Sequence, residues 1–289
     1  MSQSVRIPNL AVLLALAFVG CNKVDQGDSK PWASPPTAQT EQRKPASQTV
    51  LKEPTAEPIK VTLLRVPNDG IQPQAVADAD GTLHLVYFKG EKANAGDLFY
   101  VRREAGKERF SEPIRINSKP NSACAMGSVR GGQITLGKGG RPHVVWNGVG
   151  TDYARLDDAG TAFEEQRNLM RQTDVPDGGG TVAADDAGNV YVVWHGQAKG
   201  VRGEDKRQVW VARSTDDGKT FSMEEPAWAE PTGVCPCCST RAFADHKGIV
   251  YLLYRSATVQ VNRGTYLLFS EDLGKTFRKA LVHDWKVPG

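Results

Sequence analysis

An eight-residue pattern occurs twice in this chain, 56 residues apart. Residues 214–221 read STDDGKTF and residues 270–277 read SEDLGKTF, so serine, aspartate, glycine, threonine and phenylalanine keep the same spacing. A single active site seldom needs the same residues twice, whereas a repeated structural unit needs the same turn in every copy. The pattern therefore predicts a repeat architecture, and its residues are expected to build that architecture.

A second repeated feature is a glycine followed by an alternating apolar run. Four segments share it without gaps: GTLHLVYF from Gly81, GRPHVVWN from Gly140, GNVYVVWH from Gly188 and GIVYLLYR from Gly248. Such a run after a turn glycine is typical of a strand that is entered from a tight hairpin. Since no segment shows helical periodicity, we expect an all-β fold.

A second turn glycine follows each of these segments, at Gly106, Gly160, Gly218 and Gly274. Two such turns per repeat define four strands, and the repeats cover roughly 71–118, 130–172, 178–230 and 238–289. A unit of this kind buries its apolar face only when neighbouring units stack on it. The sequence therefore predicts a β-propeller with four-stranded antiparallel blades, of which four are visible.

The form SxDxGxTF resembles the Asp-box, or bacterial neuraminidase repeat (BNR), of the sialidase-like propeller superfamily. In that family the box lies at the outer turn of a blade, far from the axis where substrates bind. The resemblance thus implies a structural role for Ser214, Asp216, Gly218, Thr220 and Phe221 in the first copy, and for Ser270, Asp272, Gly274, Thr276 and Phe277 in the second.

The number of blades departs from the family pattern. Sialidase-like propellers have six blades, so the resemblance implies that residues 59–289 are an incomplete part, or fragment, of a six-bladed propeller. IKVTLLRV from Ile59 alternates like a strand, and we expect it to be the outer strand that closes the last blade. Closure with four blades is the alternative.

Candidate pocket residues lie where the inner strands of such propellers begin. The resemblance implies that arginines there pair with a substrate carboxylate through a bidentate fork, and that an aspartate serves as acid/base. It predicts tentative catalytic positions at Arg130, Arg241, Arg255, Asp174 and Asp177. The alternative for each is an arginine–aspartate pair between blades or a turn residue.

The first 58 residues predict export and tethering rather than folding. An apolar run from Leu10 to Gly20 is too short to span a bilayer of about 30 Å, and it ends at Cys21 in a context that resembles a lipobox. We expect a lipoprotein signal peptide over 1–21, with lipidation at Cys21. Cleavage after Ala17, which would secrete the protein, is the alternative. Residues 22–58 are rich in proline and poor in apolar residues, which predicts a disordered tether.

Four cysteines remain in the exported body: Cys124, Cys235, Cys237 and Cys238. Oxidation is the default outside the cytoplasm, so we expect disulfides, and four thiols allow three pairings. A soft-metal site is the alternative, because Cys235 and Cys238 have CxxC spacing. No bound metal or cofactor is expected. His195, at a strand end, is interpreted as an inter-blade hydrogen-bonding residue, with a role as acid/base as the alternative.

These features together predict a lipid-anchored, glycan-directed protein of the bacterial cell envelope. The first hypothesis is an exo-α-sialidase-type glycoside hydrolase that acts on a sialylated or other acidic glycan. The alternative is a non-catalytic propeller that binds a carbohydrate or a protein. A net charge of +3, without a long run of basic residues, does not suggest nucleic acid as a partner.

Overall fold

The computed structural model describes residues 61, 63–127, 130–230, 232–258 and 262–287. The expected signal peptide with Cys21 and the expected tether over 22–58 lie outside the described residues. Among the residues that are described, no helix has the length and the apolar character needed to cross a membrane.

Four antiparallel sheets of four strands each follow one another along the chain, and each is a simple meander. The first contains β1 (Ile71–Ala77), β2 (Leu83–Lys92), β3 (Ala95–Arg103) and β4 (Ile114–Arg115). The second contains β5 (Gln133–Leu136), β6 (Pro142–Asn147), β7 (Thr151–Arg155) and β8 (Arg167–Asn168). The third contains β9 (Thr173–Ala184), β10 (Val190–Ala198), β11 (Gln208–Ser214) and β12 (Glu225–Pro226). The fourth contains β13 (Arg241–Ala244), β14 (Val250–Arg255), β15 (Thr265–Ser270) and β16 (Arg278–His283).

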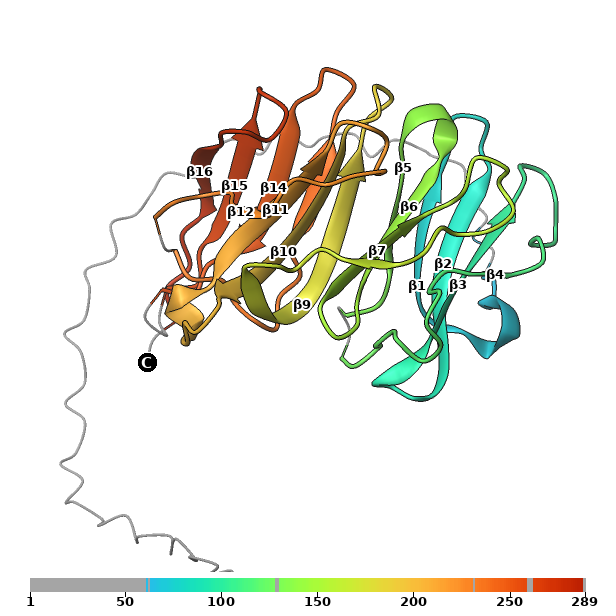
Figure 1. Cartoon of the computed structure of the whole chain (residues 1–289), viewed down its shortest axis with the longest axis horizontal. Coiled ribbons are helices and arrows are strands. Elements are labelled where there is room, and N and C mark those ends of the chain that lie inside the picture. The colour runs from blue at the N-terminus through green and yellow to red at the C-terminus, as the bar shows by residue number, and fades with distance from the viewer. Residues whose placement is uncertain (1–60, 62, 128–129, 231, 259–261, 288–289) are drawn as a thin grey trace, which may run out of the picture. The chain divides into compact units, whose positions relative to one another are not determined.

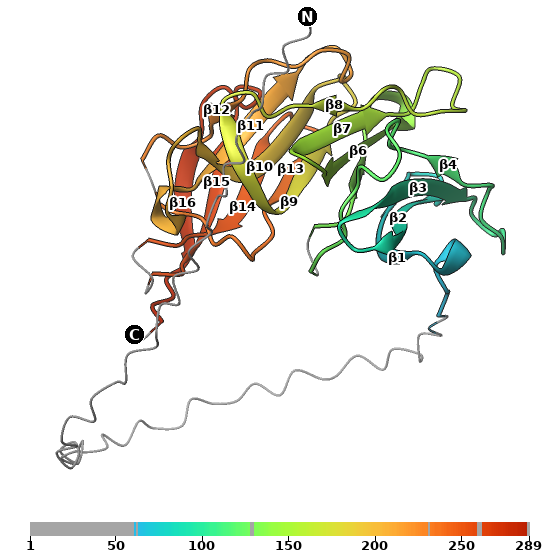
Figure 2. The ribbon, with the colours of Figure 1, turned by 60° about the horizontal axis from the view of Figure 1, so that its bottom comes forward.

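The sheets pack face to face in chain order around their first strands (Figures 1 and 2). β1 contacts β5, β5 contacts β9, and β9 contacts β13, so the first strand of every sheet is the innermost one. Short 3-10 turns at Pro67–Asp69, Lys138–Gly140 and Glu204–Lys206 are the only helical segments among the described residues. This arrangement is that of β-propeller blades, which confirms the predicted all-β class and the four-stranded antiparallel unit.

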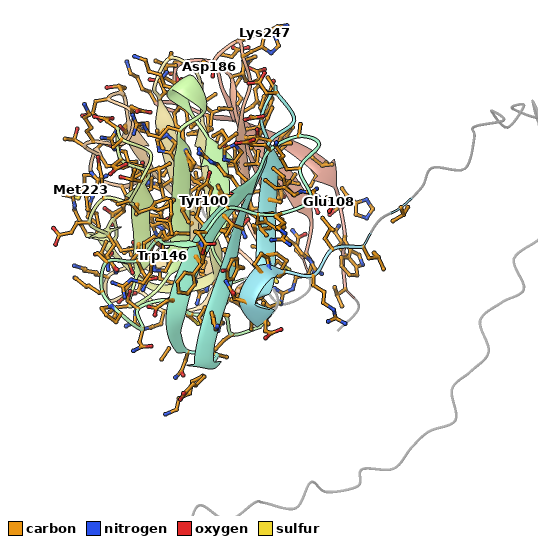
Figure 3. The ribbon with its side chains drawn as sticks, turned by 90° about the vertical axis from the view of Figure 1, so that its right-hand side faces the viewer. Tyr100, Glu108, Trp146, Asp186, Met223 and Lys247 are labelled. Carbon is orange, nitrogen blue, oxygen red and sulfur yellow. The ribbon has the colours of Figure 1, made fainter. Side chains whose placement is uncertain are left out.

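Apolar side chains between successive sheets form the core. Trp146 of the second sheet packs against Phe88 and Leu98 of the first, and all three are almost fully buried. Figure 3 shows Trp146 and Tyr100 in this interior. Tyr153 and Trp194 belong to the next layer, and a further cluster joins the third sheet to the fourth. Every sheet therefore depends on its neighbours for burial, as expected for blades.

An aspartate closes the first hairpin in three of the four sheets. Oδ1 of Asp78 accepts hydrogen bonds from the backbone N–H groups of Asp80, at 3.0 Å, and Thr82, at 2.8 Å. Asp185 and Asp245 bind the equivalent N–H groups in the third and fourth sheets. These carboxylates satisfy donors that a tight turn leaves unpaired, so the alternating segments read from the sequence become hairpins at the same positions in each repeat.

The two SxDxGxTF segments form the turns between the third and fourth strands of their sheets. In the first, Ser214 Oγ accepts a hydrogen bond from the N–H of Gly218 at 2.9 Å and donates to Asp216 Oδ1 at 2.7 Å. Asp216 in turn accepts from the backbone N–H and the hydroxyl of Thr220, at 2.9 and 2.6 Å. Burial alone would raise the pKa of Asp216, but these hydrogen bonds outweigh it and lower the pKa to about 2.

The second copy of this turn repeats the network atom for atom. Ser270 accepts from the N–H of Gly274 and donates to Asp272, which accepts from both donors of Thr276. Hydrogen bonds from Thr276 hold the pKa of Asp272 well below its usual value. The repeated letters are therefore explained by the bonding of one turn, with glycine at positive φ in both copies, 77° at Gly218 and 73° at Gly274.

These turns also fasten each sheet to the one before it. Arg155, at the end of β7, donates to the backbone carbonyl of Asp217 at 2.9 Å and to Oδ2 of that residue at 3.2 Å. Arg213, at the equivalent position of β11, donates to the carbonyl of Gly274 at 2.7 Å. We term these two contacts the arginine latches. Each joins the third strand of one sheet to the SxDxGxTF turn of the next.

The latch at Asp217 has a second layer of polar contacts. Arg141 Nε donates to Asp217 Oδ2 at 2.6 Å, and Arg155 also forms an ion pair with Glu164. His143 Nε2 lies 3.4 Å from Asp217 Oδ1, which is long for a hydrogen bond. Burial lowers the pKa of His143 to about 4, despite the opposing effect of Asp217, so this histidine is neutral at pH 7.

The segment from Ile59 was expected to be a strand, and its described part is not. Residues 63–66 pair with no strand, and Leu63 is 91% exposed. Val66 packs instead against the outer face of the first sheet, and Asn68 donates to the hydroxyl of Tyr87 at 3.0 Å. Alternation alone does not make a strand, because a strand also needs a neighbour for its backbone groups.

Candidate functional site

The innermost strands end around one shared cavity of about 520 Å³. Its lining comes from the last residues of β1, β5, β9 and β13 and from the turns that follow them. Figure 3 shows Asp186 and Lys247, which follow β9 and β13, at the same end of the body. We term this side the end face and the opposite side, where the innermost strands begin, the start face. Most of the lining is alanine, glycine and carboxylate, and it includes none of the five predicted pocket residues.

The start face is closely packed between neighbouring sheets. A Cβ atom added to Gly131 would lie 2.7 Å from Oε1 of Gln72 at the start of the first sheet. A Cβ atom on Gly178 would lie 2.5 Å from the carbonyl oxygen of Cys238 and 2.8 Å from that of Pro236. Glycine is therefore required where the loops leading into the innermost strands cross the neighbouring sheet. The predicted arginines lie among these loops.

Arg130 precedes the second sheet and Arg241 begins the fourth. Arg130 is half-buried and lies three residues before β5. Arg241 is the first residue of β13 and is exposed, and its Nη1 donates only to the carbonyl of Thr240, at 3.3 Å. No described carboxylate forms an ion pair with Arg241, whose pKa is lowered by desolvation from its neighbours.

Arg255 lies at the same end of the fourth sheet as Arg241, because Arg241 pairs with Leu253 in the strand register. Its guanidinium stacks on the ring of Trp285, 4.3 Å from the ring centre, and Nη1 lies 3.6 Å from Sγ of Cys238. Arg255 is therefore held by a cation–π contact and a sulfur contact. Trp285 belongs to no repeated pattern, so its contact with Arg255 could not be predicted from the sequence.

The two predicted aspartates belong to β9. Asp174 is partly exposed, and both its carboxylate oxygens lie 3.2 Å from Nη1 of Arg202. Asp174 and Arg202 both belong to the third sheet and its loops, so this ion pair does not join two blades. The carboxylate of Asp174 is already paired with this arginine. Asp177 pairs with His195 in the strand register at an irregular point of the ladder. For Asp177 the structure describes the position of the backbone and not that of the side chain.

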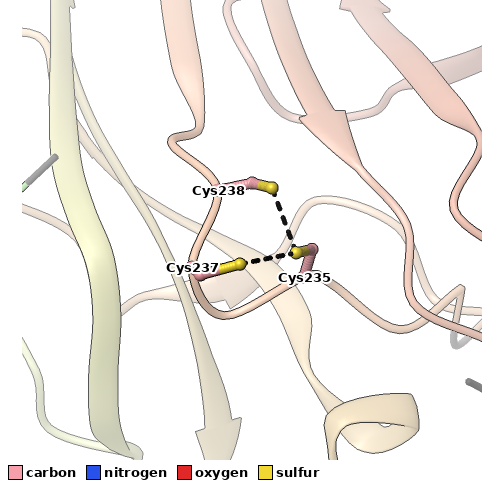
Figure 4. Close-up of side chains that lie close together, drawn as sticks. All are labelled: Cys235, Cys237 and Cys238. Atoms are coloured by element: carbon pink, nitrogen blue, oxygen red, sulfur yellow. Dashed lines mark hydrogen bonds between the residues drawn. The ribbon is translucent and has the colours of Figure 1, made fainter. Parts of the chain in front are cut away.

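Three of the four expected disulfide cysteines gather in the turn before β13. Sγ of Cys235 lies 3.3 Å from Sγ of Cys237 and 3.0 Å from Sγ of Cys238 (Figure 4). Cys124 is not part of this group, and all four are free thiols in the structure. Which disulfides form on export therefore stays a prediction.

The thiols of Cys235 and Cys238 differ in their acid–base behaviour. Burial and the neighbouring sulfurs raise the pKa of the Cys235 thiol to about 12. Burial would also raise the pKa of Cys238, but hydrogen bonds from Cys235 and Arg255 and the charge of Arg255 outweigh it and lower that pKa. Cys238 thus ionises more readily than Cys235, beside a fixed cation.

His195 bridges two sheets. It lies in β10 and is fully buried, and its Nε2 is 3.1 Å from the carbonyl oxygen of Cys238 in the loop before the fourth sheet. This contact is the expected inter-blade hydrogen bond, although β10 continues to Ala198 and His195 is therefore not at the strand end. It holds the cysteine turn against the third sheet.

Comparison with known proteins finds similarity to solved structures only. Neither a protein-family model nor a curated protein matches the sequence. A protein of unknown function from Dyadobacter fermentans is 16% identical with a TM-score of 0.51, and the match covers 73% of this chain and 68% of that one. A Hadza microbial sialidase is 16% identical with a TM-score of 0.48, and the match covers 73% of this chain but only 46% of the sialidase. An α-L-arabinanase from Penicillium chrysogenum is 10% identical with a TM-score of 0.49, over 75% of this chain and 67% of that one.

The sheets, their order and the first of these similarities define the class of protein. The chain is an all-β propeller protein built from four-stranded antiparallel blades. At such low identity the similarity shows the fold alone, and many functions occur on one fold. The function must therefore be inferred from the residues of the start face.

Proposed function

We propose that this protein is an exported, glycan-directed propeller that binds an acidic sugar at its start face. A lipid on Cys21 anchors it to a membrane of the bacterial cell envelope, and residues 22–58 tether the propeller to that anchor. The apolar run that ends at Cys21 supports the anchoring. In cells that process lipoproteins, Cys21→Ser is expected to move the protein out of the membrane fraction, and unchanged fractionation would contradict the anchor.

The binding proposal rests on one observation, which is the exposure of Arg241 together with its lack of a described ion-pair partner. Its guanidinium is exposed on the start face, it is partly desolvated, and no described carboxylate neutralises it. The fold thus holds a planar cation whose five donors fit a carboxylate or a similar anion. Arg255, fixed by Trp285 at the same end of the sheet, adds positive charge nearby.

Hydrolysis of a sialoside is the second candidate function. The SxDxGxTF turns favour it, because they resemble those of the sialidase-like superfamily. The same resemblance requires a tyrosine nucleophile assisted by a glutamate. Among the described residues, hydrogen bonds join tyrosine hydroxyls to Asn68, His84, His143, Thr232 and Asp245, and none joins one to a glutamate. Binding of an acidic sugar requires only the cation of Arg241 and its surroundings, which are among the described residues, so it is the first function proposed.

Calorimetric titration of the full chain with N-acetylneuraminic acid, glucuronic acid and glucose tests the proposal. The two acids are expected to bind and glucose is not, with binding that weakens as salt is raised. A charge-assisted hydrogen bond contributes roughly 1.5–3 kcal/mol, so Arg241→Ala is expected to weaken binding of the acids by about 10-fold or more.

Arg278→Ala is the matched control, because Arg278 is an exposed arginine of β16 that pairs with Glu271. It should leave the affinity unchanged. Equal binding of glucose and the acids, or equal losses in the two variants, would contradict the proposal. Release of a fluorophore from a sialoside by the wild-type chain, abolished by Arg241→Ala, would replace binding with hydrolysis as the function.

A further inference from the structure

The turn before β13 brings three sulfur atoms to one point. Sγ of Cys235 is within 3.3 Å of the other two, and all three lie within 4.8 Å of one another. Cys235 is buried, Cys238 is half-buried and Cys237 is exposed, so the group has a closed side and an open side. Figure 4 shows the three side chains pointing toward one another from a single turn.

The backbone of this turn is fixed from both adjoining sheets. The N–H of Cys235 donates to the carbonyl of Arg255 at 2.9 Å, and the N–H of Cys238 donates to the carbonyl of Cys235 at 3.2 Å. His195 contacts the carbonyl oxygen of Cys238 from the third sheet, and Gly178 leaves room for that contact. The sulfurs are therefore brought together before any ligand arrives, which reduces the entropy cost of binding one.

The donor set consists of sulfur alone. Among the described residues, no histidine, aspartate or glutamate joins the three cysteines in a potential metal-binding group. Zinc in structural sites almost always takes four ligands, and an iron–sulfur cluster takes four cysteines. Soft thiolates select Cu(I), for which three sulfur ligands are sufficient. Arg255 lies 3.6 Å from Cys238 and offsets part of the negative charge of three thiolates around a monovalent ion.

We infer that Cys235, Cys237 and Cys238 form a binding site for one Cu(I) ion on the start face of the propeller. Binding replaces up to three thiol protons, which pass to solvent, with one Cu(I), and no electron is transferred in this step. A disulfide between two of these cysteines would use two sulfurs and leave the third without a partner in the group, whereas one ion engages all three. This inference does not depend on the proposed sugar binding.

Anaerobic titration of the reduced full chain with Cu(I), in competition with a chromophoric Cu(I) chelator, tests the site. We expect a single equivalent to bind, with a sulfur-to-copper charge-transfer band in the ultraviolet and a first coordination shell of sulfur in X-ray absorption. Cys237→Ser removes one ligand from the exposed side, so the fold should be retained. Mutation of a residue that only hydrogen-bonds to a metal ligand lowers the metal affinity by about 10- to 100-fold. Loss of the ligand Cys237 itself should lower the affinity for Cu(I) by more than that.

Cys124→Ser is the matched control, since Cys124 lies outside the group, and it should bind Cu(I) like the wild-type chain. Circular dichroism of each variant verifies that the sheets are intact. Three results would each overturn the inference. These are wild-type affinity in Cys237→Ser, displacement of Cu(I) by an equal concentration of Zn(II), and loss of two thiols to a disulfide in air at the same rate with and without Cu(I).

Discussion

At several positions of this fold, the turn of the backbone restricts which residue type can be present more than charge does. Gly218 is the clearest example, because it has a φ of 77° and an added Cβ would overlap the hydroxyl of Tyr153. That hydroxyl cannot move away easily, since Tyr153 is fully buried and its oxygen lies 2.7 Å from Nδ1 of His143. The glycine is therefore required both by conformation and by the close approach of two sheets.

Gly218→Ala is expected to destabilise the protein far more than Gly106→Ala. Both positions have positive φ, which costs roughly 1–2 kcal/mol for alanine, but a Cβ on Gly106 would meet no atom within 4 Å. Overpacking against Tyr153 should add about 1–3 kcal/mol in Gly218→Ala alone. Urea unfolding of the two variants measures this difference, and equal losses of stability would show that Tyr153 is not in contact with the turn.

Local patterns in the sequence predicted the repeated hairpins, although they also predicted a strand from Ile59 that does not form among the described residues. The period of two and the turn glycines placed β2, β6, β10 and β14 correctly, because both signals depend on neighbouring residues only. The role of Asp217 could not be predicted in this way. The equivalent position of the second copy is Leu273, so the turn itself does not need this aspartate, and its partners come from another sheet. The Arg255–Trp285 stack could not be predicted either, because Trp285 belongs to no repeated pattern.

At the scale of elements, the arginine latches add directional contacts to apolar packing. Arg155 is 2% exposed and bonds to Asp217 of the next sheet and to Glu164 of its own. Removing one partner of a buried ion pair leaves a desolvated charge without compensation, which costs about 3–5 kcal/mol for a fully buried pair. Glu164 is partly exposed, so the lower part of this range applies.

Arg155→Met should therefore lower the free energy of unfolding by about 3 kcal/mol, as measured by chemical denaturation. Arg278→Met is its control, because the exposed Arg278–Glu271 pair should contribute less than about 1 kcal/mol. A loss in Arg155→Met no greater than in its control would contradict the latch.

At the scale of the whole molecule, the two ends of the innermost strands differ in charge and in packing. The end face contains a cavity with Asp78, Asp80 and Asp186 in its lining, and such carboxylates disfavour an anion. The start face carries Arg130 in the loop before β5, Arg241 at the start of β13 and Arg255 at the end of β14. The candidate site was located from the repeat spacing, and the CPCC segment already placed three thiols close together in the sequence. The ion pair of Asp174 with Arg202 could not be predicted, because it depends on the fold of the third sheet.

The central claim of this account is that an acidic sugar binds at the start face and not in the cavity of the end face. Both faces can be tested on one strand, because Arg241 begins β13 on the start face and Phe243, 62% exposed, lines the cavity. Calorimetric titration of N-acetylneuraminic acid into the wild-type chain, Arg241→Ala and Phe243→Ala measures the claim directly. The account predicts binding about 10-fold weaker or more in Arg241→Ala and unchanged in Phe243→Ala. Loss of binding in Phe243→Ala with full affinity in Arg241→Ala would contradict it.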